Sequence, residues 1–323
     1  MDLEKYSIVL QDYLSEVIID REPKQLYEPI QYILSLGGKR LRPVLTLMTC
    51  HFFKDDFKKA IPAAVALELF HNFSLIHDDI MDKAPIRRGN ITVHEKWDLN
   101  TGILSGDAML ILAYQLFEGY SAETFQELAK LFSKTALEVC EGQQYDVDFE
   151  SRNDVTISEY LTMIEYKTSV LIGAAMKMGA IIGEASDSCK EGCYNFGRDI
   201  GIAFQLQDDY LDAFGDPTSF GKQVGGDIIA NKKTFLYIKA LQNCTPSEAT
   251  ELEQFFNRTP ENPSEKIKRV KQLFESTGAA EATKNEIEAY TQKANDVLET
   301  IAIAEEHKNT LRAFGEMLMK RKV

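Results

Sequence analysis

Two five-residue segments rich in aspartate are the part of this sequence best suited to chemistry. They read DDIMD at 78–82 and DDYLD at 208–212, and each follows a stretch patterned like an apolar helix. Because a helix turns by about 100° per residue, the first and fifth residues of each segment point the same way and can offer oxygen ligands to one hard cation. We call these segments the acidic pentads.

Carboxylates at the end of apolar segments are costly to bury unless they are paired or metal-bound. An acidic cluster on one helix is commonly a solvated surface, but a second copy of the same spacing makes that explanation poor. Ligation by carboxylate oxygens favours Mg²⁺ over zinc. The sequence therefore predicts two helix faces packed across a cavity, with magnesium between their carboxylates.

Basic residues near glycines or near the pentads predict pockets for a small, highly charged anion. Lys39 and Arg42 follow the pair Gly37-Gly38 at the start of a predicted helix, where the helix dipole favours negative charge. Phosphate is the natural ligand for such cations. The other basic candidates are Arg87, Arg88, Lys167, Lys222, Lys232 and Lys233.

The composition excludes several classes of function. A net charge of −14 over 323 residues argues against nucleic acid and anionic membranes as partners. No apolar run approaches the roughly 20 residues of a membrane span, and the first residues lack the features of a signal peptide, so we expect a cytoplasmic protein without stable membrane anchoring. The 5 cysteines show no paired CxxC spacing, which argues against a disulfide framework and a zinc site.

Apolar residues recur at helical spacing through most of the chain, and alternating strand patterns are scarce. The pattern predicts an all-α fold, a single-domain helical bundle around a deep central cavity. Its helices include 39–53, 58–81, 156–184 and one long helix over 279–318. The stretch 214–227 is too rich in glycine and proline to be helical and is predicted to be a substrate lid.

The ordered motifs resemble the trans-isoprenyl diphosphate synthases of the polyprenyl synthetase family over nearly the whole chain. The matching segments are GGKRLRP at 37–43, HDDIMDKAPIRRG at 77–89, YKTS at 166–169, GIAFQLQDDYLD at 201–212, GKQVGGDI at 221–228 and NKKT at 231–234. The resemblance implies one polyprenyl synthetase domain over 1–323 and a homodimer. It also implies magnesium-dependent, head-to-tail trans condensation of isopentenyl diphosphate with dimethylallyl, geranyl or farnesyl diphosphate, with release of pyrophosphate.

The resemblance also assigns roles to residues. Asp78, Asp82 and Asp208 would bind Mg²⁺ directly, three ions to an active site, and Asp79, Asp209 and Asp212 would complete the charge or hold ligand waters. The allylic diphosphate would be held by Arg87, Lys167, Lys222 and Lys232. Isopentenyl diphosphate would be held by Lys39, Arg42, His71 and Arg88. Thr168 and Gln205 would stabilise the allylic cation, and pyrophosphate would take up the released proton.

Product length in such enzymes depends on side chains below the first pentad, here Phe73 and Ser74. Phe73 is bulky and favours a short product, while Ser74 is small where strict fifteen-carbon enzymes often carry a second aromatic residue. We therefore expect geranylgeranyl diphosphate or a farnesyl/geranylgeranyl mixture. Phe73 is alternatively only a packed core residue, as many aromatic side chains are.

Two other functions remain open from the sequence. A terpene cyclase also ionises allylic diphosphates, but it needs no pocket for isopentenyl diphosphate and usually lacks a complete second aspartate motif. A non-catalytic regulatory subunit of a prenyl synthase would share the fold, but its acidic motifs would be expected to have eroded. Both pentads are intact here.

Overall fold

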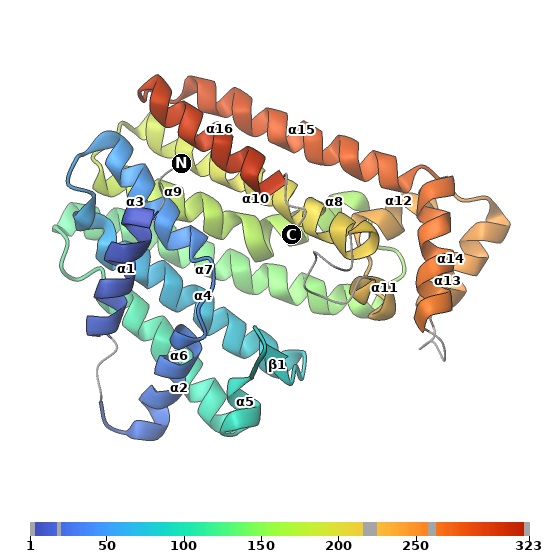
Figure 1. The fold of residues 1–323 in the computed structure, drawn as a ribbon, viewed down its shortest axis with the longest axis horizontal. Coiled ribbons are helices and arrows are strands. Elements are labelled where there is room, and N and C mark those ends of the chain that lie inside the picture. The colour runs from blue at the N-terminus through green and yellow to red at the C-terminus, as the bar shows by residue number, and fades with distance from the viewer. Residues whose placement is uncertain (1–3, 18–20, 216–224, 258–262, 320–323) are drawn as a thin grey trace. The chain divides into compact units, whose positions relative to one another are not determined.

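The computed structural model describes residues 4–17, 21–215, 225–257 and 263–319 (Figure 1). The chain divides into two compact units, which we call unit 1 (Met1–Ala136 with Ala174–Tyr194) and unit 2 (Leu137–Gly173 with Asn195–Val323). Each unit is built almost entirely from helices, which confirms the all-α prediction. A single domain with a central cavity stays a prediction.

The helices of unit 1 are α1 (Glu4–Val17), α2 (Lys24–Ser35), α3 (Leu41–Phe53), the 3₁₀ turn η1 (Phe57–Ala60), α4 (Ile61–Met81), α5 (Val93–Lys96) and α6 (Leu99–Gln115). Residues of α7 (Ala122–Ser151), α9 (Val170–Ile182) and α10 (Asp187–Phe214) belong to both units. Unit 2 adds α8 (Ile157–Ile164), the π-helix η2 (Glu165–Ser169), α11 (Gly226–Ile229), α12 (Phe235–Asn243), α13 (Pro246–Phe256), α14 (Pro263–Ser276), α15 (Ala279–Thr300) and α16 (Glu305–Met319).

Helix α4 is the core of unit 1 and ends in the first pentad. Helix α6 packs against it through two glycines: a Cβ on Gly102 would lie 2.9 Å from Ile80 Cδ1, and one on Gly106 would lie 2.4 Å from His77 Nε2. By length and composition the segment Phe57–Met81 could cross a membrane, but 67% of its most apolar window is buried inside the structure. Burial of this kind is normal for the core helix of a globular unit.

After α4 the chain makes a short hairpin. Strand β1 (Ile86–Arg87) pairs antiparallel with β2 (Asn90–Ile91), and the turn between them uses positive φ angles at Arg88 (52°) and Gly89 (75°). Pro85 and Gly89 favour a loop here, and the hairpin gives that loop a fixed form. It positions Arg87 to contact Asp79 near the C-terminal end of α4, and Arg88 to contact the glycine pair before α3.

The segment 156–184, predicted as one helix, is interrupted in unit 2. Its residues 165–169 form a π-helix, whose wider turns are uncommon and frequently occur at functional sites. Two neighbouring helices come close to it at glycines: a Cβ on Gly142 of α7 would lie 2.3 Å from the Lys167 backbone nitrogen, and one on Gly201 of α10 would lie 2.8 Å from Ser169 Cα. Only glycine allows both helices to approach the π-helix this closely.

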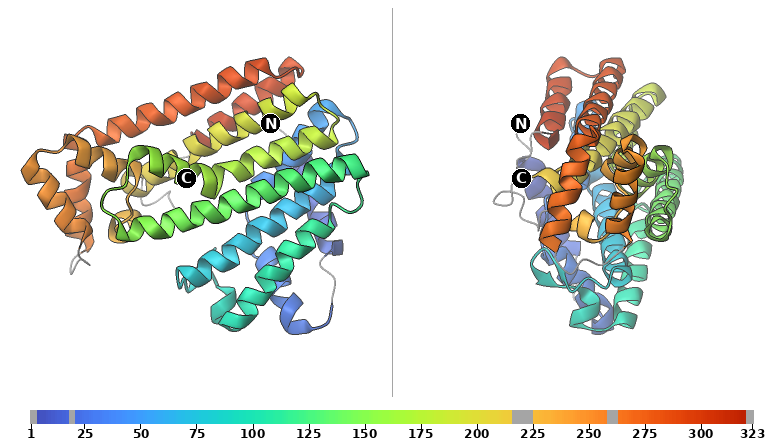
Figure 2. Two further views of the ribbon diagram at one scale, coloured as in Figure 1. Left: turned by 180° about the vertical axis from the view of Figure 1, so that it is seen from behind. Right: turned by 90° about the vertical axis from the view of Figure 1, so that its right-hand side faces the viewer.

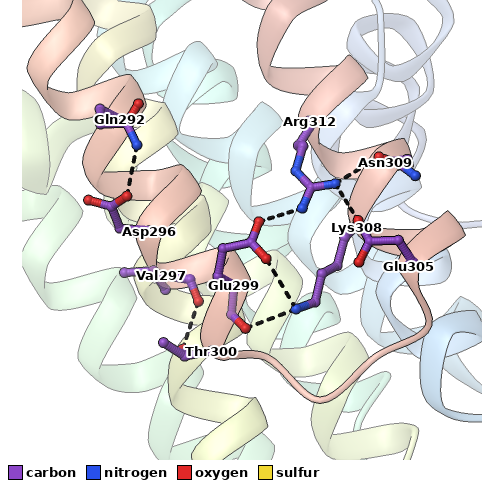
Figure 3. A network of polar contacts seen from close by, with 9 residues as sticks. All are labelled: Gln292, Asp296, Val297, Glu299, Thr300, Glu305, Lys308, Asn309 and Arg312. Atoms are coloured by element: carbon purple, nitrogen blue, oxygen red, sulfur yellow. Dashed lines mark hydrogen bonds and ion pairs between the residues drawn. The ribbon is translucent and has the colours of Figure 1, made fainter.

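The prediction of one helix over 279–318 is wrong, because the chain turns back after Thr300 and α16 lies alongside α15 (Figure 2). Polar side chains stabilise this corner, as Figure 3 shows. Lys308 Nζ donates to the Glu299 carbonyl oxygen at 2.9 Å, and Arg312 pairs with both Glu299 and Glu305. Helical periodicity continues across the turn, so the sequence pattern alone did not reveal it.

Candidate active site

At the glycine pair before α3, in unit 1, the side chain of Arg88 comes close to the backbone. Gly37 and Gly38 have φ angles of 74° and 137°, which disfavour any residue with a side chain. A Cβ on Gly38 would lie 2.9 Å from Arg88 Cζ, and Arg88 Nη1 donates to the Gly37 carbonyl. Arg88 is thereby held against the backbone of the glycine pair, which lies just before Lys39 in the sequence. The joint role of Lys39 and Arg88 in binding an anion stays a prediction.

Arg42 and His71 form a partly buried pair in the same unit. Arg42 Nη1 lies 3.2 Å from His71 Nε2, and since a guanidinium can only donate, Nε2 must accept and the imidazole is neutral. Burial lowers the pKa of His71 well below its ordinary value, and the positive charges of Arg42, Arg88 and Arg87 lower it further. The sequence predicted that both residues bind an anion, and the structure brings them together.

The buried carboxylate of Glu68 acts as a counter-charge for Arg42 and Arg88. This residue was not identified from the sequence. Glu68 is only 4% exposed and accepts a hydrogen bond from Asn72 Nδ2 at 3.1 Å. Burial lowers the pKa of Arg42, whereas the negative charge of Glu68 acts in the opposite direction, as it also does on Arg88. An acidic residue inside the apolar run of α4, one turn before His71, was the signal that could have revealed it.

In the first pentad the second residue, Asp79, is buried, whereas the first and last residues, Asp78 and Asp82, are more exposed. Asp79 is 2% exposed, and Arg87 grips both of its oxygens, Nε to Oδ2 and Nη2 to Oδ1, each at 2.7 Å. Asp78 is partly exposed and Asp82, which caps the end of α4, is exposed. Asp79 thus binds a side chain of its own unit, while Asp78 and Asp82 remain accessible from solvent.

One of the two residues predicted to set product length, Phe73, lies in an aromatic cluster. The Phe73 ring lies 5.5 Å from that of Phe70 and 4.7 Å from the His77 imidazole, and Phe70 packs edge-on against Phe132 at 5.3 Å. Ser74 is partly buried, and its hydroxyl donates to the His71 carbonyl of the preceding turn. Both residues are partly buried, and their contacts here are with other residues of α4.

Unit 2 carries the second pentad and the π-helix. Lys167 Nζ, on the π-helix, pairs with Asp146 of α7 at 2.5 Å, and Thr168 Oγ1 makes a long contact of 3.4 Å to Gln205 Oε1 on α10. Asp146 was not predicted as a site residue. The sequence DVD after the apolar part of α7 offered only a weak signal for it.

The second aspartate of this pentad is buried and bonded, as in the first pentad. Asp209 is 8% exposed; its Oδ2 accepts from the Tyr160 hydroxyl at 2.5 Å and its Oδ1 from Gln205 Nε2 at 2.9 Å. Burial, followed by repulsion from Asp227, raises the pKa of Asp209 to about 7. Sequence reasoning did not identify Tyr160.

The last aspartate of the second pentad has a structural partner too. Asp212 Oδ2 accepts the backbone N–H of Asp227 at 2.9 Å, which ties the start of α11 to the end of α10. Burial and the neighbouring Asp227 carboxylate raise the pKa of Asp212 to about 6. The same Asp227 pairs with Lys232 at 3.4 Å. Burial lowers the pKa of Lys232, but the negative charges nearby outweigh burial, so its pKa is raised. These charges are the carboxylates of Asp227, Asp146 and Asp209.

Lys222 and most of the predicted lid fall outside the described residues. Within the described part of the chain, no group of three or more histidine, cysteine or acidic side chains is arranged as a metal site. Each pentad nevertheless offers carboxylate oxygens one helical turn apart, which are the ligands that Mg²⁺ prefers. By donor chemistry Asp78 and Asp82 of unit 1, and separately Asp208 of unit 2, offer oxygens suited to Mg²⁺.

Comparison with known proteins identifies the family and the fold. The family described as Polyprenyl synthetase matches residues 23–275. A geranylgeranyl diphosphate synthase from Methanosarcina mazei is 43% identical over 231 residues, 71% of each chain. A crystal structure of a geranylgeranyl pyrophosphate synthase is 54% identical and covers 100% of both chains with a TM-score of 0.95. A polyprenyl synthase from Caulobacter crescentus, solved with calcium and isoprenyl diphosphate, is 25% identical, covers 100% of this chain and 95% of that one, and has a TM-score of 0.85.

Proposed function

Since this chain belongs to the polyprenyl synthetase family and is a trans-isoprenyl diphosphate synthase, we propose that it condenses isopentenyl diphosphate with allylic diphosphates in a magnesium-dependent reaction. The product we propose is geranylgeranyl diphosphate or a farnesyl/geranylgeranyl mixture. The M. mazei relative and the 54% identical crystal structure carry the name of the twenty-carbon synthase, which supports the longer product.

One observation carries this proposal: two aspartates spaced one turn apart and the histidine that contacts Arg42 lie on or cap the same helix, α4. His71, bonded to Arg42, precedes Asp78 on α4 by two helical turns, about 10 Å along the axis. Glu68, one turn earlier, supplies the buried counter-charge for Arg42 and Arg88. A helix with this arrangement suits two separate anionic groups, one held by protein cations and one held through a metal.

The residues then have the following tasks. Lys39, Arg42, His71 and Arg88 hold the diphosphate of isopentenyl diphosphate; Arg87, Lys167, Lys222 and Lys232 help to hold that of the allylic substrate. Mg²⁺, held by Asp78, Asp82 and Asp208, supplies Lewis-acid stabilisation of the leaving pyrophosphate when bound. The C. crescentus structure with calcium and isoprenyl diphosphate supports a divalent cation in this role.

Chemistry at the allylic carbon needs no protein base. The C–O bond to pyrophosphate breaks, Thr168 and Gln205 direct oxygen dipoles toward the cation, and the double bond of isopentenyl diphosphate attacks it to form the new C–C bond. A proton is then lost to pyrophosphate. Arg87 contributes by orienting Asp79, which keeps the first pentad's other carboxylates in position.

We also propose a homodimer formed through α6. One face of α6 packs against α4, but Leu104 and Ile111, seven residues apart and so on one face, are 59% and 60% exposed. Exposed apolar residues of this kind commonly mark an interface. Sedimentation of the wild type and of Leu104→Glu tests it: a monomeric wild-type protein would contradict the dimer.

The decisive experiment supplies the purified chain with Mg²⁺, radiolabelled isopentenyl diphosphate and each allylic primer, followed by product-length analysis. We expect condensation that is abolished by a chelator and reduced by several orders of magnitude in Asp78→Ala and Asp208→Ala. Asp187→Ala, an exposed aspartate at the start of α10, is the matched control. A cyclic hydrocarbon from farnesyl diphosphate alone would indicate a terpene cyclase, and inactivity with every primer would indicate a regulatory subunit.

A further inference from the structure

Tyr160 of α8 is the most deeply buried phenol beside the second pentad. It is 1% exposed, and its hydroxyl donates to Asp209 Oδ2 at 2.5 Å, a short hydrogen bond. Its ring also packs edge-on against Phe235 at 6.3 Å. A phenylalanine ring could pack in the same way, so the packing does not explain why a hydroxyl is present here.

The bond to Tyr160 belongs to a chain of three contacts within unit 2. Asp209 Oδ1 accepts from Gln205 Nε2 at 2.9 Å, and Thr168 Oγ1 lies 3.4 Å from Gln205 Oε1. The NH₂ end of the Gln205 amide donates to Asp209, so the carbonyl end of the same amide is turned toward Thr168. Asp209 therefore selects one of the two orientations of the amide.

We propose that Tyr160 is a positioning residue for the condensation: by fixing Asp209, it keeps the carbonyl oxygen of Gln205 turned toward Thr168, where it stabilises the allylic cation. This inference rests on the proposed function. Without the phenol, Asp209 loses the partner of one oxygen and can rotate. The amide of Gln205 then loses its fixed orientation, and a misdirected NH₂ group would repel the developing positive charge.

The test compares Tyr160→Phe with Tyr237→Phe. Tyr237 is a matched control because it is a buried tyrosine of the same unit, 2% exposed, whose ring packs against Phe256 rather than beside the second pentad. We expect Tyr160→Phe to lower kcat about tenfold, the effect of losing one hydrogen bond to a charged group, with KM for isopentenyl diphosphate unchanged. Tyr237→Phe should change kcat by less than about twofold.

A double-mutant cycle separates positioning from general damage. In a Gln205→Leu background the phenol has no amide to orient, so adding Tyr160→Phe should cause no further loss of kcat. Calorimetry with an unreactive allylic thiolodiphosphate should give the same affinity for wild type and Tyr160→Phe, since the phenol does not touch the diphosphate. Asp209→Asn, which places an N–H donor opposite Gln205, should reproduce the loss of kcat if Tyr160→Phe does not fold.

Three results would overturn the inference. They are equal activity of Tyr160→Phe and Tyr237→Phe, a multiplicative loss of kcat in the double mutant, and full activity of Asp209→Asn. A wild-type chain without condensation activity refutes the proposed function instead and takes this inference with it, so the two failures are distinguishable.

Discussion

Arg87 holds Asp79 with two parallel contacts of 2.7 Å, and this pairing parallels the bonding of Asp209 by Tyr160 and Gln205 in the other pentad. In both pentads the second aspartate is buried and bonded by its own unit, while the first is only partly buried. The two aspartates at the start of each motif therefore have different tasks, although the sequence repeats them identically.

The first prediction concerns stability. Asp79→Asn should lower the free energy of unfolding by about 2 kcal/mol, because it leaves Arg87 without a full counter-charge in a mostly buried position. Asp82→Asn, at an exposed position of the same pentad, should change it by less than about 0.5 kcal/mol. Urea unfolding of the metal-free proteins measures both, and equal changes would contradict the structural role of Asp79.

The second prediction concerns the π-helix. Gly142→Ala should destabilise the protein by about 1–3 kcal/mol and lower kcat, because the added methyl group would lie 2.3 Å from the Lys167 nitrogen and must displace the segment that carries Lys167 and Thr168. Gly119→Ala is the control, since nothing lies within 4 Å of its Cβ position. Thermal unfolding and steady-state kinetics decide, and a wild-type kcat in Gly142→Ala would show that the π-helix tolerates displacement.

The third prediction concerns pH. The folded protein lowers the pKa of His71 through burial and nearby arginines, so below an ordinary value of 6.5 the unfolded chain binds a proton that the folded chain rejects. Stability contributed by this group is complete above pH 6.5 and is lost as the pH falls toward the folded pKa. When the pH falls from 7.5 to 5.5, the free energy of unfolding of the wild type should decrease by about 1.4 kcal/mol more than that of His71→Asn.

The matched control for this measurement is His94→Asn, a histidine of α5 in the same unit that lies next to Glu95. Denaturant unfolding at the two pH values gives the difference for each protein. If His71→Asn and the wild type lose the same stability on acidification, the neutral histidine inferred from the Arg42 contact is refuted.

The fourth prediction concerns product length. Ser74→Phe should shorten the product, because a ring at this partly buried position of α4 would join Phe73 and Phe70 in narrowing the space below the first pentad. Phe73→Ala should lengthen it. Chromatography of dephosphorylated products at a fixed ratio of the two substrates is the measurement, and an unchanged distribution in both variants would remove these residues from chain-length control.

Several features of this protein follow from the sequence alone. Helical periodicity over nearly all of the chain requires an all-α fold, because apolar side chains repeated at this spacing can only be buried together on helices. The spacing within each pentad, the pair Gly37-Gly38 and the adjacent basic residues also specify phosphate and metal chemistry locally. The family resemblance assigned Arg42 and His71 to the same ligand, and they are in contact.

Tertiary structure decided which side chains support that chemistry. Glu68, Asp146 and Tyr160 carry no motif of their own, since each acts on a residue far along the chain or on another helix, and pair contacts of that kind leave no periodic signal. The π-helix at 165–169 depends on glycines of two other helices, so propensity within the segment predicted an ordinary helix. Local spacing determines which atoms a helix can present, but burial and the partners of those atoms depend on packing between segments distant in sequence.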